Sequence, residues 1–545
     1  MAKPKIPNQK KKYQELNNRL NRYVALVEQI YDTLNLEAAK IALNTEYDAD
    51  GGTVFKFSDY PQTKKSIADI QARFVDDVRS VIYRGTSDEW KISNEVQDLM
   101  ADKVLKAYTA TIDKEKYKVL YQTNSDALKA FHNRRDRGFN VSAKLWQQST
   151  IYKEELEAAI SCAIQKGTSA VTLSKQISKY LLDFPSLQKD YKEKYGNAEH
   201  LKDCEYRSIR LARSEINMAY RAAENERWKQ MDFVVGYEIK LSGGHHHHMP
   251  HGDICDTLAG KYPKDFVWTG WHPNDLCYKV PILKTEEEFW AWDGRSESTT
   301  ESVNEVKDVP NSFKKWVLDN QQRVENAKKI GTLPYFLRDN KSALNNISLE
   351  KSVNEIVLLA SSVGSEVQEF AEYIANRNNG FVTPINYKSP SSIIRKVTTE
   401  GITPYDIKDA VRTTIIVPKE NIENTLKDLS IDESFIRLKR QAPKSFMGYS
   451  GNIINIKTSN GLIAEIQVNT AKMIYAKEKT IDAKRILGEK FWNEIYAQTG
   501  VEGGLGHKYY EQWRVLDKAS KKAIEIAKNQ LIIIVISNKN HYLYI

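Results

Sequence analysis

The sequence predicts a multidomain fold that is mainly α-helical over its first two thirds and α+β in its last third. Three observations lead to this prediction. At 545 residues the chain is too long for one hydrophobic core. Apolar residues recur at helical spacing over much of the segment before about Met231. Beyond about residue 350, strand patterns alternate with helical patterns, as in a mixed sheet with flanking helices.

The composition is that of an ordinary soluble protein, with 41% hydrophobic and 28% charged residues. No apolar run reaches the roughly 18 residues that span a bilayer, so we expect no membrane contact. The basic start MAKPKIPNQKKKY leads into an amphipathic segment, which predicts no secretion signal. Four scattered cysteines predict no disulfide framework and a reducing cytoplasm. The net charge of +9 gives only a mild bias toward anionic partners.

We expect five segments in chain order. They are an N-terminal helical region (1–130), a second region that ends in irregular loops (131–292), a linker with a bridging helix (293–349), an α+β domain (350–530) and a C-terminal tail (531–545). The polar run DGRSESTTESVNEVKDVPN predicts the linker. The run LIIIVIS near the C-terminus is short, which fits a buried strand.

One long helix, about Tyr206 to Met231, carries three arginines at a spacing of three: Arg207, Arg210 and Arg213. This spacing places the three cations along one stripe of the helix. The stripe is either a solvated face, paired with Glu205, Glu215 and Glu224, or a contact for phosphate or an acidic partner.

Histidines and cysteines gather between residues 245 and 277. His251 and Cys255 form one closely spaced pair, and His272 and Cys277 form a second. Two such pairs on loops could close a tetrahedral zinc site. The alternative is that the cysteines are small buried residues and that His-Pro is a turn. We expect the four-histidine run 245–248 to be a flexible loop.

Five segments between about 130 and 290 form an ordered set: GFNVSAKLW, LARSEINMAYRAAENERW, FVVGYEIKLS, DICDTLAGKYP and HPNDLCYKVPIL. The set resembles the minor head (head-morphogenesis) proteins of Mu-type phages. The resemblance implies a minor capsid protein in the virion near the portal, delivered to the host cytoplasm. Its implied partners are portal and capsid proteins and phage DNA. Asp275 and Gly252 stand where this family has cysteines, so His251 would have to substitute as a zinc ligand.

The stretch 448–470, GYSGNIINIKTSNGLIAEIQVNT, predicts a β-hairpin, because Asn-Gly separates two alternating apolar runs. In its second strand Glu465 and Gln467 share one face, while Ile466 and Val468 share the other. One face of the hairpin is therefore built for burial, and the other presents a carboxylate and an amide.

A second polar group precedes the hairpin. Ser389-Pro390 predicts the start of a helix that carries Lys388, Ser392, Arg395 and Lys396. Cations and hydroxyls at a helix N-terminus suit a polyphosphate. Asp409 lies just before Arg412 and a β-branched strand, and a carboxylate there, together with Glu465, suits Mg²⁺ with substrate phosphates.

A run of basic residues followed by an aromatic residue offers a second anion-binding site, with a ring on which a base could stack. It comprises Arg437, Lys439, Arg440, Lys444 and Tyr449.

Five motifs in order, NYKSPSSIIRK, KDAVRTT, PKSFMGYSG, EIQVNT and Gly506-His507-Lys508-Tyr509, resemble the RelA/SpoT-like nucleotide pyrophosphokinases. The resemblance, closest to the small toxic alarmone synthetases that make guanosine tetraphosphate, implies a nucleotidyltransferase-like domain. It implies transfer of pyrophosphate from ATP to the ribose 3′-hydroxyl of a guanine nucleotide or tRNA. The implied roles are ATP binding by Lys388, Ser392, Arg395, Lys396 and Arg412; Mg²⁺ binding and catalysis by Asp409 and Glu465, supported by Gln467; and acceptor binding by Lys439, Lys444, Tyr449 and His507.

Some positions depart from the family pattern. Asn386 and Asn469 stand where the family has arginines, and Asp406 is a rival to Asp409 for the metal role. Asn469 shares the strand face of Glu465 and Gln467 by alternation. Two alternatives therefore stay open: a structural virion protein with an inactive C-terminal domain, and a nucleic-acid-binding module.

Overall fold

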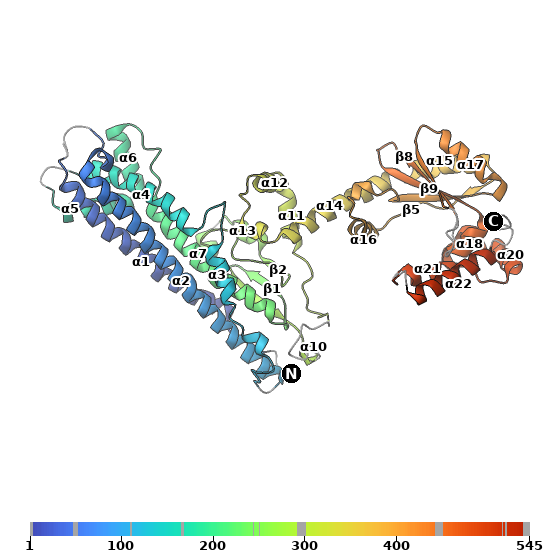
Figure 1. The fold of residues 1–545 in the computed structure, drawn as a ribbon, viewed down its shortest axis with the longest axis horizontal. Coiled ribbons are helices and arrows are strands. Elements are labelled where there is room, and N and C mark those ends of the chain that lie inside the picture. Colours follow the sequence, from blue (N-terminus) through green and yellow to red (C-terminus); the bar gives the residue numbers. More distant parts are fainter. Residues whose placement is uncertain are drawn as a thin grey trace. The chain divides into compact units, whose positions relative to one another are not determined.

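The computed structural model of the chain describes residues 4–46, 53–109, 112–164, 168–243, 245–249, 251–290, 301–441, 451–514, 516–517 and 520–537. Its contacts divide the chain into two units, Met1–Leu344 and Asn345–Ile545 (Figure 1). The first unit is mostly helical with one small sheet, and the second carries a mixed sheet with flanking helices. The prediction of a helical part followed by a mixed-sheet part is confirmed at this level.

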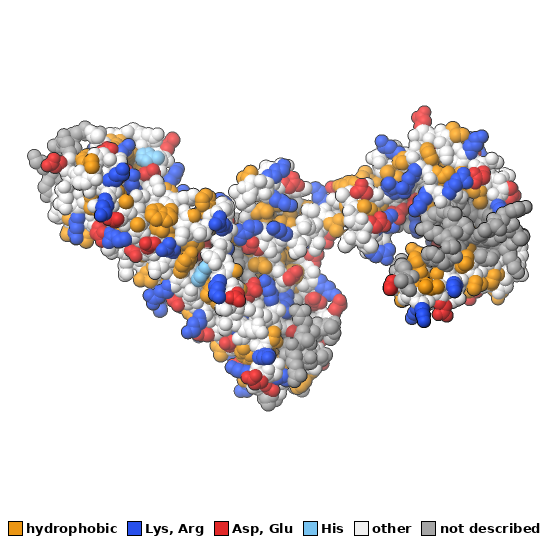
Figure 2. Space-filling model, viewed as in Figure 1, with side chains coloured by type: hydrophobic (Ala, Val, Ile, Leu, Met, Phe, Trp, Pro, Cys, Tyr) orange, Lys and Arg blue, Asp and Glu red, His pale blue; other side chains and the backbone are white. Residues whose placement is uncertain are grey.

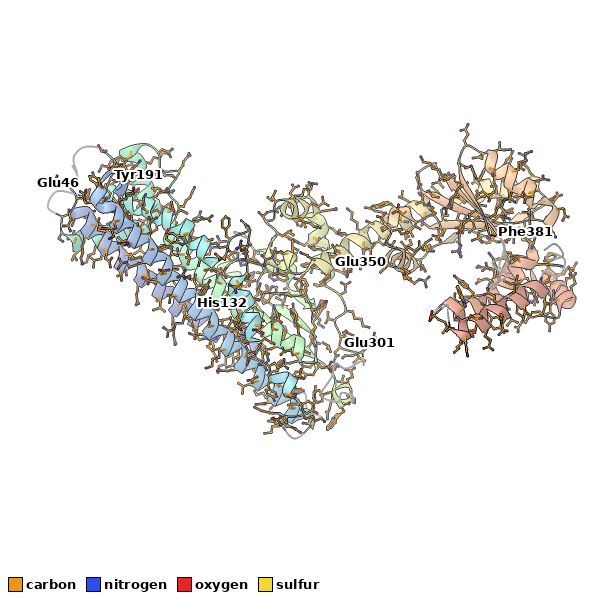
Figure 3. The ribbon with its side chains drawn as sticks, in the orientation of Figure 1. Glu46, His132, Tyr191, Glu301, Glu350 and Phe381 are labelled. Atoms are coloured by element: carbon orange, nitrogen blue, oxygen red, sulfur yellow. The ribbon has the colours of Figure 1, made fainter. Side chains whose placement is uncertain are left out.

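The helices of the first unit are α1 (Gln9–Leu43), α2 (Pro61–Thr109), α3 (Ser125–Asn133), α4 (Val141–Ala163), α5 (Ala170–Leu182), α6 (Phe184–Tyr195), α7 (Cys204–Gln230), α8 (His245–His248), α9 (Ile254–Leu258), α10 (Glu286–Trp290), α11 (Asn311–Asp319), α12 (Gln321–Lys329) and α13 (Tyr335–Arg338). Short 3₁₀ turns lie at η1 (Phe57–Asp59) and η2 (Lys118–Tyr121). The strands are β1 (Val234–Lys240), β2 (Gly260–Tyr262) and β3 (Tyr278–Leu283). Helix α14 (Lys341–Ser362), on which Figure 3 labels Glu350, contains the boundary between the units.

Four long helices, α1, α2, α4 and α7, run side by side and form the main core of the first unit (Figure 1). Their apolar stripes meet in a cluster of rings, where Tyr31 lies 5.5 Å from Phe74 and 5.0 Å from Tyr152 between centroids. The buried hydroxyl of Tyr152 donates to Asn35 Oδ1 at 2.7 Å, so burial of this polar group is compensated. One core thus spans the expected boundary at residue 130.

The small sheet of the first unit is antiparallel with the strand order β2-β1-β3. Helices α11 and α13 pack against this sheet through an aromatic cluster. In the cluster the ring centroid of Phe313 lies 5.9 Å from that of Tyr262 and 6.4 Å from that of Phe336. The expected linker 293–349 is therefore packed where the structure describes it, from 301 onward. The composition of this segment is polar, but Phe313 of α11 and Phe336 of α13 anchor it to the small sheet.

The helices of the second unit, after α14, are α15 (Gly364–Arg377), α16 (Pro390–Glu400), α17 (Ile422–Ile431), α18 (Ala471–Lys477), α19 (Thr480–Leu487), α20 (Glu489–Thr499), α21 (Leu505–Arg514) and α22 (Lys521–Ser537), with 3₁₀ turns η3 (Pro404–Asp406) and η4 (Lys419–Asn421). Its strands are β4 (Phe381–Val382), β5 (Asn386–Tyr387), β6 (Val411–Ile416), β7 (Phe435–Gln441), β8 (Gly451–Lys457) and β9 (Ile463–Asn469).

The sheet of the second unit has the order β4-β6-β9-β8-β7, and β5 also pairs with β6. Strands β6 and β9 are parallel, and the other pairs are antiparallel. Helices α15 and α17 contact the sheet and share its apolar core, which includes Ile415, Ile454, Ile466 and Val468. The predicted hairpin is present as β8 and β9, with Gly461 at φ +86° in the turn, a conformation that favours glycine.

The run LIIIVIS was predicted as a strand, and this prediction is wrong, since it forms the last turns of α22. Ile534 is buried there against Met473 and Ala476 of α18, whereas Ile532 is half-exposed. An unbroken apolar run carries no periodicity that separates a helix from a strand, and here packing of one helix face decides. None of the described helices combines the length and apolar character needed to cross a membrane.

Candidate functional site

A row of polar side chains crosses the sheet of the second unit on the face opposite its apolar core. Residues directly opposite one another on paired strands share a face. The pairing therefore places five residues in one row, which runs Asn386 (β5), Arg412 (β6), Glu465 (β9), Asn455 (β8) and Arg437 (β7). Local alternation predicted the face of Glu465, but only the parallel β6–β9 pairing brings Arg412 beside it.

Asp409 lies immediately before β6 and receives two ammonium groups. Lys388 Nζ donates to its Oδ2 at 2.7 Å, and Lys396 Nζ donates to its Oδ1 at 3.0 Å. Burial alone would raise the pKa of Asp409, but the hydrogen bonds from the two lysines outweigh it and hold the pKa below its ordinary value. The carboxylate is therefore ionised near neutral pH, and two predicted ATP ligands converge on the predicted metal ligand.

Helix α16 delivers Lys396 to this group. Ser389 caps its N-terminus by accepting from Ser392 N at 3.3 Å, and Pro390 occupies the first turn, as predicted. Ile393 faces the apolar core, which orients the helix so that Lys396 reaches Asp409. Arg395, predicted to bind ATP, is exposed on the other side of the turn.

Glu465 is held in place by a chain of hydrogen bonds. Gln467 Nε2 donates to Glu465 Oε1 at 2.7 Å, and Lys477 Nζ of α18 donates to Gln467 Oε1 at 2.9 Å. The lysine therefore fixes which way the amide points, and the amide in turn orients the carboxylate. The sequence predicted the Glu465–Gln467 pair but missed Lys477, since no local pattern ties a residue ten positions later to this strand.

The predicted acceptor residues are described only in part. Lys439 is exposed on β7, and its partner Ile453 is in turn paired with Gln467, so Lys439 shares the face of the polar row. Lys444 and Tyr449 lie outside the described residues, as does the side chain of His507, whose backbone belongs to α21.

Asn455 is a second residue that the sequence missed. It is fully buried in the middle of the row, accepts from Arg437 Nε at 2.7 Å and donates to Lys408 O at 3.2 Å. It thereby ties β8 to the segment just before Asp409. An asparagine in an alternating strand gives no signal of this role until the strand pairing is known.

The structure locates the three residues that depart from the family pattern or compete for a role in it: Asn386, Asn469 and Asp406. Asn386 pairs with Arg412, so Arg412 lies beside that place in the row. Asn469 ends β9 and is buried, and its Nδ2 has no hydrogen-bond partner among the described residues. Asp406 is exposed and caps its own turn by accepting from Thr403 N at 2.9 Å. The geometry therefore favours Asp409 over Asp406 beside the two lysines.

In the first unit, the three arginines of the α7 stripe have two different surroundings. Arg207 and Arg210 line a cavity of about 500 Å³, whereas Arg213 donates to Asn17 and Asn21 of α1. Two of the three glutamates expected to pair with the stripe bind other cations, Glu215 to Arg134 and Glu224 to Lys279. On the face of this unit seen in Figure 2, basic and acidic side chains are interspersed.

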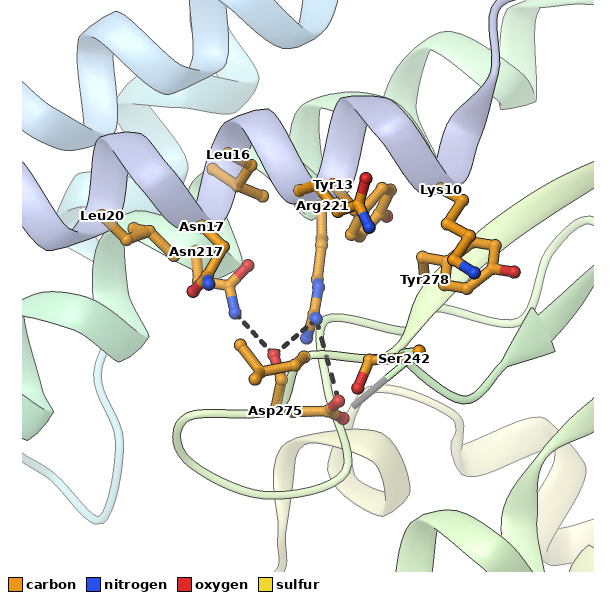
Figure 4. A pocket seen from close by; sticks show the side chains of 13 residues that line it. Lys10, Tyr13, Leu16, Asn17, Leu20, Asn217, Arg221, Ser242, Asp275 and Tyr278 are labelled. Carbon is orange, nitrogen blue, oxygen red and sulfur yellow. Dashed lines mark hydrogen bonds and ion pairs between the residues drawn. The ribbon is translucent and has the colours of Figure 1, made fainter. Parts of the chain in front are cut away.

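A cavity of about 410 Å³ lies between α1 and the loops of the small sheet (Figure 4). On its wall Arg221 Nη2 and Asn217 Nδ2 both donate to the backbone oxygen of Asp275, at 2.7 and 2.9 Å. The Asp275 carboxylate accepts from Trp271 N and Cys277 N at 2.7 Å each. Asp275 therefore organises the loop in front of Cys277.

Three of the four predicted zinc ligands lie in two neighbouring groups that share Cys255, one with Cys277 and one with His272. Cys255 and Cys277 are buried together with His245, and their donor atoms all lie within 4.8 Å of one another. His272 Nε2 lies 3.2 Å from Cys255 Sγ. His251 is exposed and is absent from the clusters among the described residues, so its predicted role is corrected in favour of His245. Spacing along the chain could not distinguish them, because the turn of α8 folds the first histidine of the run inward.

Comparisons with known proteins bear on part of the chain. No family model matches it. Over 170 residues, 31% of its length, the chain is 35% identical to the (p)ppApp synthetase toxin Tas1 of Pseudomonas aeruginosa (strain UCBPP-PA14), and it spans 38% of that protein.

Two solved structures were also found. The Type VI effector Tas1, in complex with its immunity protein, is 32% identical with a TM-score of 0.32, and the match covers 35% of this chain and 97% of that one. The small alarmone synthetase 1 from Bacillus subtilis is 15% identical with a TM-score of 0.22, covering 34% and 93%. The phage minor head resemblance has no counterpart among these findings. Part of the chain is thus similar in sequence to a (p)ppApp synthetase toxin, which supports a pyrophosphokinase domain in that part.

Proposed function

We propose that the second unit transfers the β,γ-pyrophosphate of ATP to the ribose 3′-hydroxyl of a nucleotide acceptor. The observation that carries this proposal is the polar row, in which Glu465 stands beside Arg412 while Asp409 gathers Lys388 and Lys396 at the start of the same strand. Similarity to a (p)ppApp synthetase toxin over 170 residues supports it.

In this proposal the carboxylates of Asp409 and Glu465 would hold a magnesium ion, since Mg²⁺ is commonly bound by one or two carboxylates together with substrate phosphates. When bound, the ion supplies charge neutralisation to the phosphates. In this proposal Lys388 and Lys396 exchange part of their contact with Asp409 for phosphate oxygens. Both lysines are partly exposed, at 18% and 29% of their side chains, so a substrate can reach them.

In the proposed reaction the acceptor 3′-oxygen attacks the β-phosphorus of ATP. A new O–P bond forms, the bond between the β-phosphorus and the α–β bridging oxygen breaks, and AMP leaves. The hydroxyl proton passes to the Glu465 carboxylate, which Gln467 and Lys477 orient. Arg412 and the two lysines stabilise the charge on the phosphates, so most of the rate enhancement comes from positioning and electrostatics.

The acceptor is open to three classes. The motif resemblance gave a guanine nucleotide or tRNA, and the name of the Pseudomonas relative adds an adenine nucleotide. Exposed basic side chains on β7, Arg437 and Lys439, share the face of Glu465 and are placed to meet the acceptor's phosphates.

The test uses the full chain with γ-labelled ATP, Mg²⁺ and, in parallel, GDP, GTP, ADP, ATP and tRNA as acceptors. We expect label in one acceptor class and none with the Asp409→Asn variant. Absence of transfer to every acceptor by a folded chain would overturn the proposal. If an ATP analogue also fails to bind in calorimetry, the inactive-domain alternative is favoured, and RNA binding that falls steeply with salt would favour a nucleic-acid-binding module.

The virion role of residues 131–292 is a separate proposal that rests on the ordered phage-like segments alone. It predicts that the chain is present in purified particles and contacts portal or capsid proteins. Its absence from particles made by a lysogen that expresses it would contradict that role without affecting the proposed chemistry.

A further inference from the structure

The His/Cys cluster of the first unit is independent of the proposed chemistry. Two connections of the small sheet supply it: the β1–β2 connection carries His245 on α8 and Cys255 on α9, and the end of the β2–β3 loop carries Cys277. All three side chains are buried, at 8%, 1% and 1% exposure. Two sulfurs and an imidazole that converge in a buried place are donors that zinc prefers to magnesium or calcium.

We propose that His245, Cys255, Cys277 and His272 bind one structural zinc ion. A zinc ion with bonds of about 2.0–2.3 Å brings its donors to roughly 3.3–3.8 Å from one another in a tetrahedron. His272 Nε2 lies 3.2 Å from Cys255 Sγ, close to this range. The donors of His245, Cys255 and Cys277 lie within 4.8 Å of each other, so these three need to close by only about 1 Å. His272 belongs to a second group, with Cys255 and Asp253, and completes the set by moving toward His245 and Cys277.

The ring of His272 is oriented as in a zinc ligand. Its Nδ1 lies 2.8 Å from the Pro273 carbonyl oxygen, which can only accept, so Nδ1 carries the proton. In the neutral ring Nε2 then holds a lone pair, and this nitrogen faces Cys255 Sγ and, at 3.1 Å, Asp253 Oδ2. The Cys255 thiol proton can bridge Sγ and Nε2, and a zinc ion that replaces this proton would bind both atoms beside the Asp253 carboxylate. Imidazole bonded to a backbone carbonyl through its other nitrogen is the usual arrangement around protein zinc.

Two carboxylates, those of Asp253 and Asp256, lie beside His245 and add negative charge around the proposed zinc ion. Asp253 Oδ1 lies 3.4 Å from His245 Nε2 and also accepts from Cys255 N at 2.7 Å, which fixes the start of α9. Asp256 Oδ2 lies 3.0 Å from His245 Nε2.

The ion would join the β1–β2 and β2–β3 connections of the small sheet to each other. Asp275, bound to Arg221, already fixes the backbone of the loop before Cys277, so one ligand is positioned before metal arrives. Loss of the ion should therefore loosen the small sheet and leave the four-helix core intact.

The experiment uses the full chain with His246→Ser, His247→Ser and His248→Ser, which removes adventitious chelation by the histidine run, purified without a metal column. We expect one zinc per chain by elemental analysis after dialysis. Replacing zinc with Co²⁺ should give the intense near-ultraviolet absorption of cobalt bound to two thiolates. Cys255→Ser and Cys277→Ser should weaken zinc binding at least tenfold, and His272→Ala less.

The matched control is His251→Ser, which removes an exposed histidine four residues before Cys255. It should retain its zinc. A parent chain without bound zinc, or one whose cobalt form lacks thiolate absorption, would overturn the proposal even if a cysteine variant failed to fold. Retention of zinc by both cysteine variants, or loss of zinc with His251→Ser, would contradict the assigned ligands.

Discussion

The Glu465→Gln substitution separates the chemistry of the second unit from its stability. Glu465 lies on β9 opposite Arg412 on one side and Asn455 on the other. Gln467 Nε2 donates to its Oε1 at 2.7 Å. Glutamine has the same shape and keeps that oxygen as an acceptor, so the strand pairing and this hydrogen bond remain available. The change removes the negative charge and the ability to accept a proton.

Two magnitudes can therefore be compared. A hydrogen bond to a charged group contributes about 1 kcal/mol more than a neutral one, and Glu465 is only partly buried, so unfolding free energy should change by about 1 kcal/mol or less. General base catalysis typically contributes about 10²–10⁴ in rate. We expect the turnover rate of Glu465→Gln to fall by at least about 100-fold while the melting temperature shifts by only a few degrees.

The assay measures initial rates of labelled pyrophosphate transfer and thermal unfolding on the same preparation. Glu423→Gln is the control, since Glu423 is exposed and pairs with Arg440 away from the row. It should keep its activity. If Glu465→Gln retained more than about half the wild-type rate, Glu465 would not be the proton acceptor. If its activity fell only in parallel with unfolding, the role would be structural.

Three further predictions concern other groups. Lys477→Met should lower turnover about tenfold with little change in KM for ATP, because it frees the Gln467 amide without touching substrate; an unchanged rate would remove Lys477 from the positioning chain. The lowered pKa of Asp409 means that its ion pairs stabilise the fold above the unfolded value of about 3.9, and that this stability is lost as pH falls through the folded pKa. Denaturant unfolding of Asp409→Asn should therefore depend less on pH below about 4 than wild type, and equal slopes would contradict this. Burial raises the pKa of Glu155 to about 8, so the contribution of Glu155 to stability should fall as pH rises from about 4 to 8. Glu155→Gln should be more stable than wild type by about 1–3 kcal/mol at pH 8 and nearly equal at pH 4, and a variant destabilised at both would refute it.

The sequence was most informative where a local pattern decides the structure. The hairpin of β8 and β9 follows from one turn and two alternating runs, and the cap at Ser389 follows from two adjacent residues. It could not show that Lys388 and Lys396 would both reach Asp409, because that depends on β5 and α16 flanking the start of β6. The contributions of Lys477 and Asn455 depend on tertiary packing in the same way.

The first unit shows the same limit. Spacing suggested that His251 would join Cys255, but the fold places His245 in the cluster and leaves His251 in solvent. A ligand set drawn from loops depends on how each loop turns, which residue spacing alone does not determine. Likewise, LIIIVIS is helical because α22 packs against α18, not because of its own propensity.

The most direct test of the central claim is to identify both products of the reaction by mass spectrometry. The account predicts AMP and an acceptor that has gained two phosphates at its 3′-oxygen, in equal amounts and dependent on Asp409 and Glu465. Formation of ADP with a singly phosphorylated acceptor, or of ADP and inorganic phosphate alone, would contradict pyrophosphate transfer by the second unit.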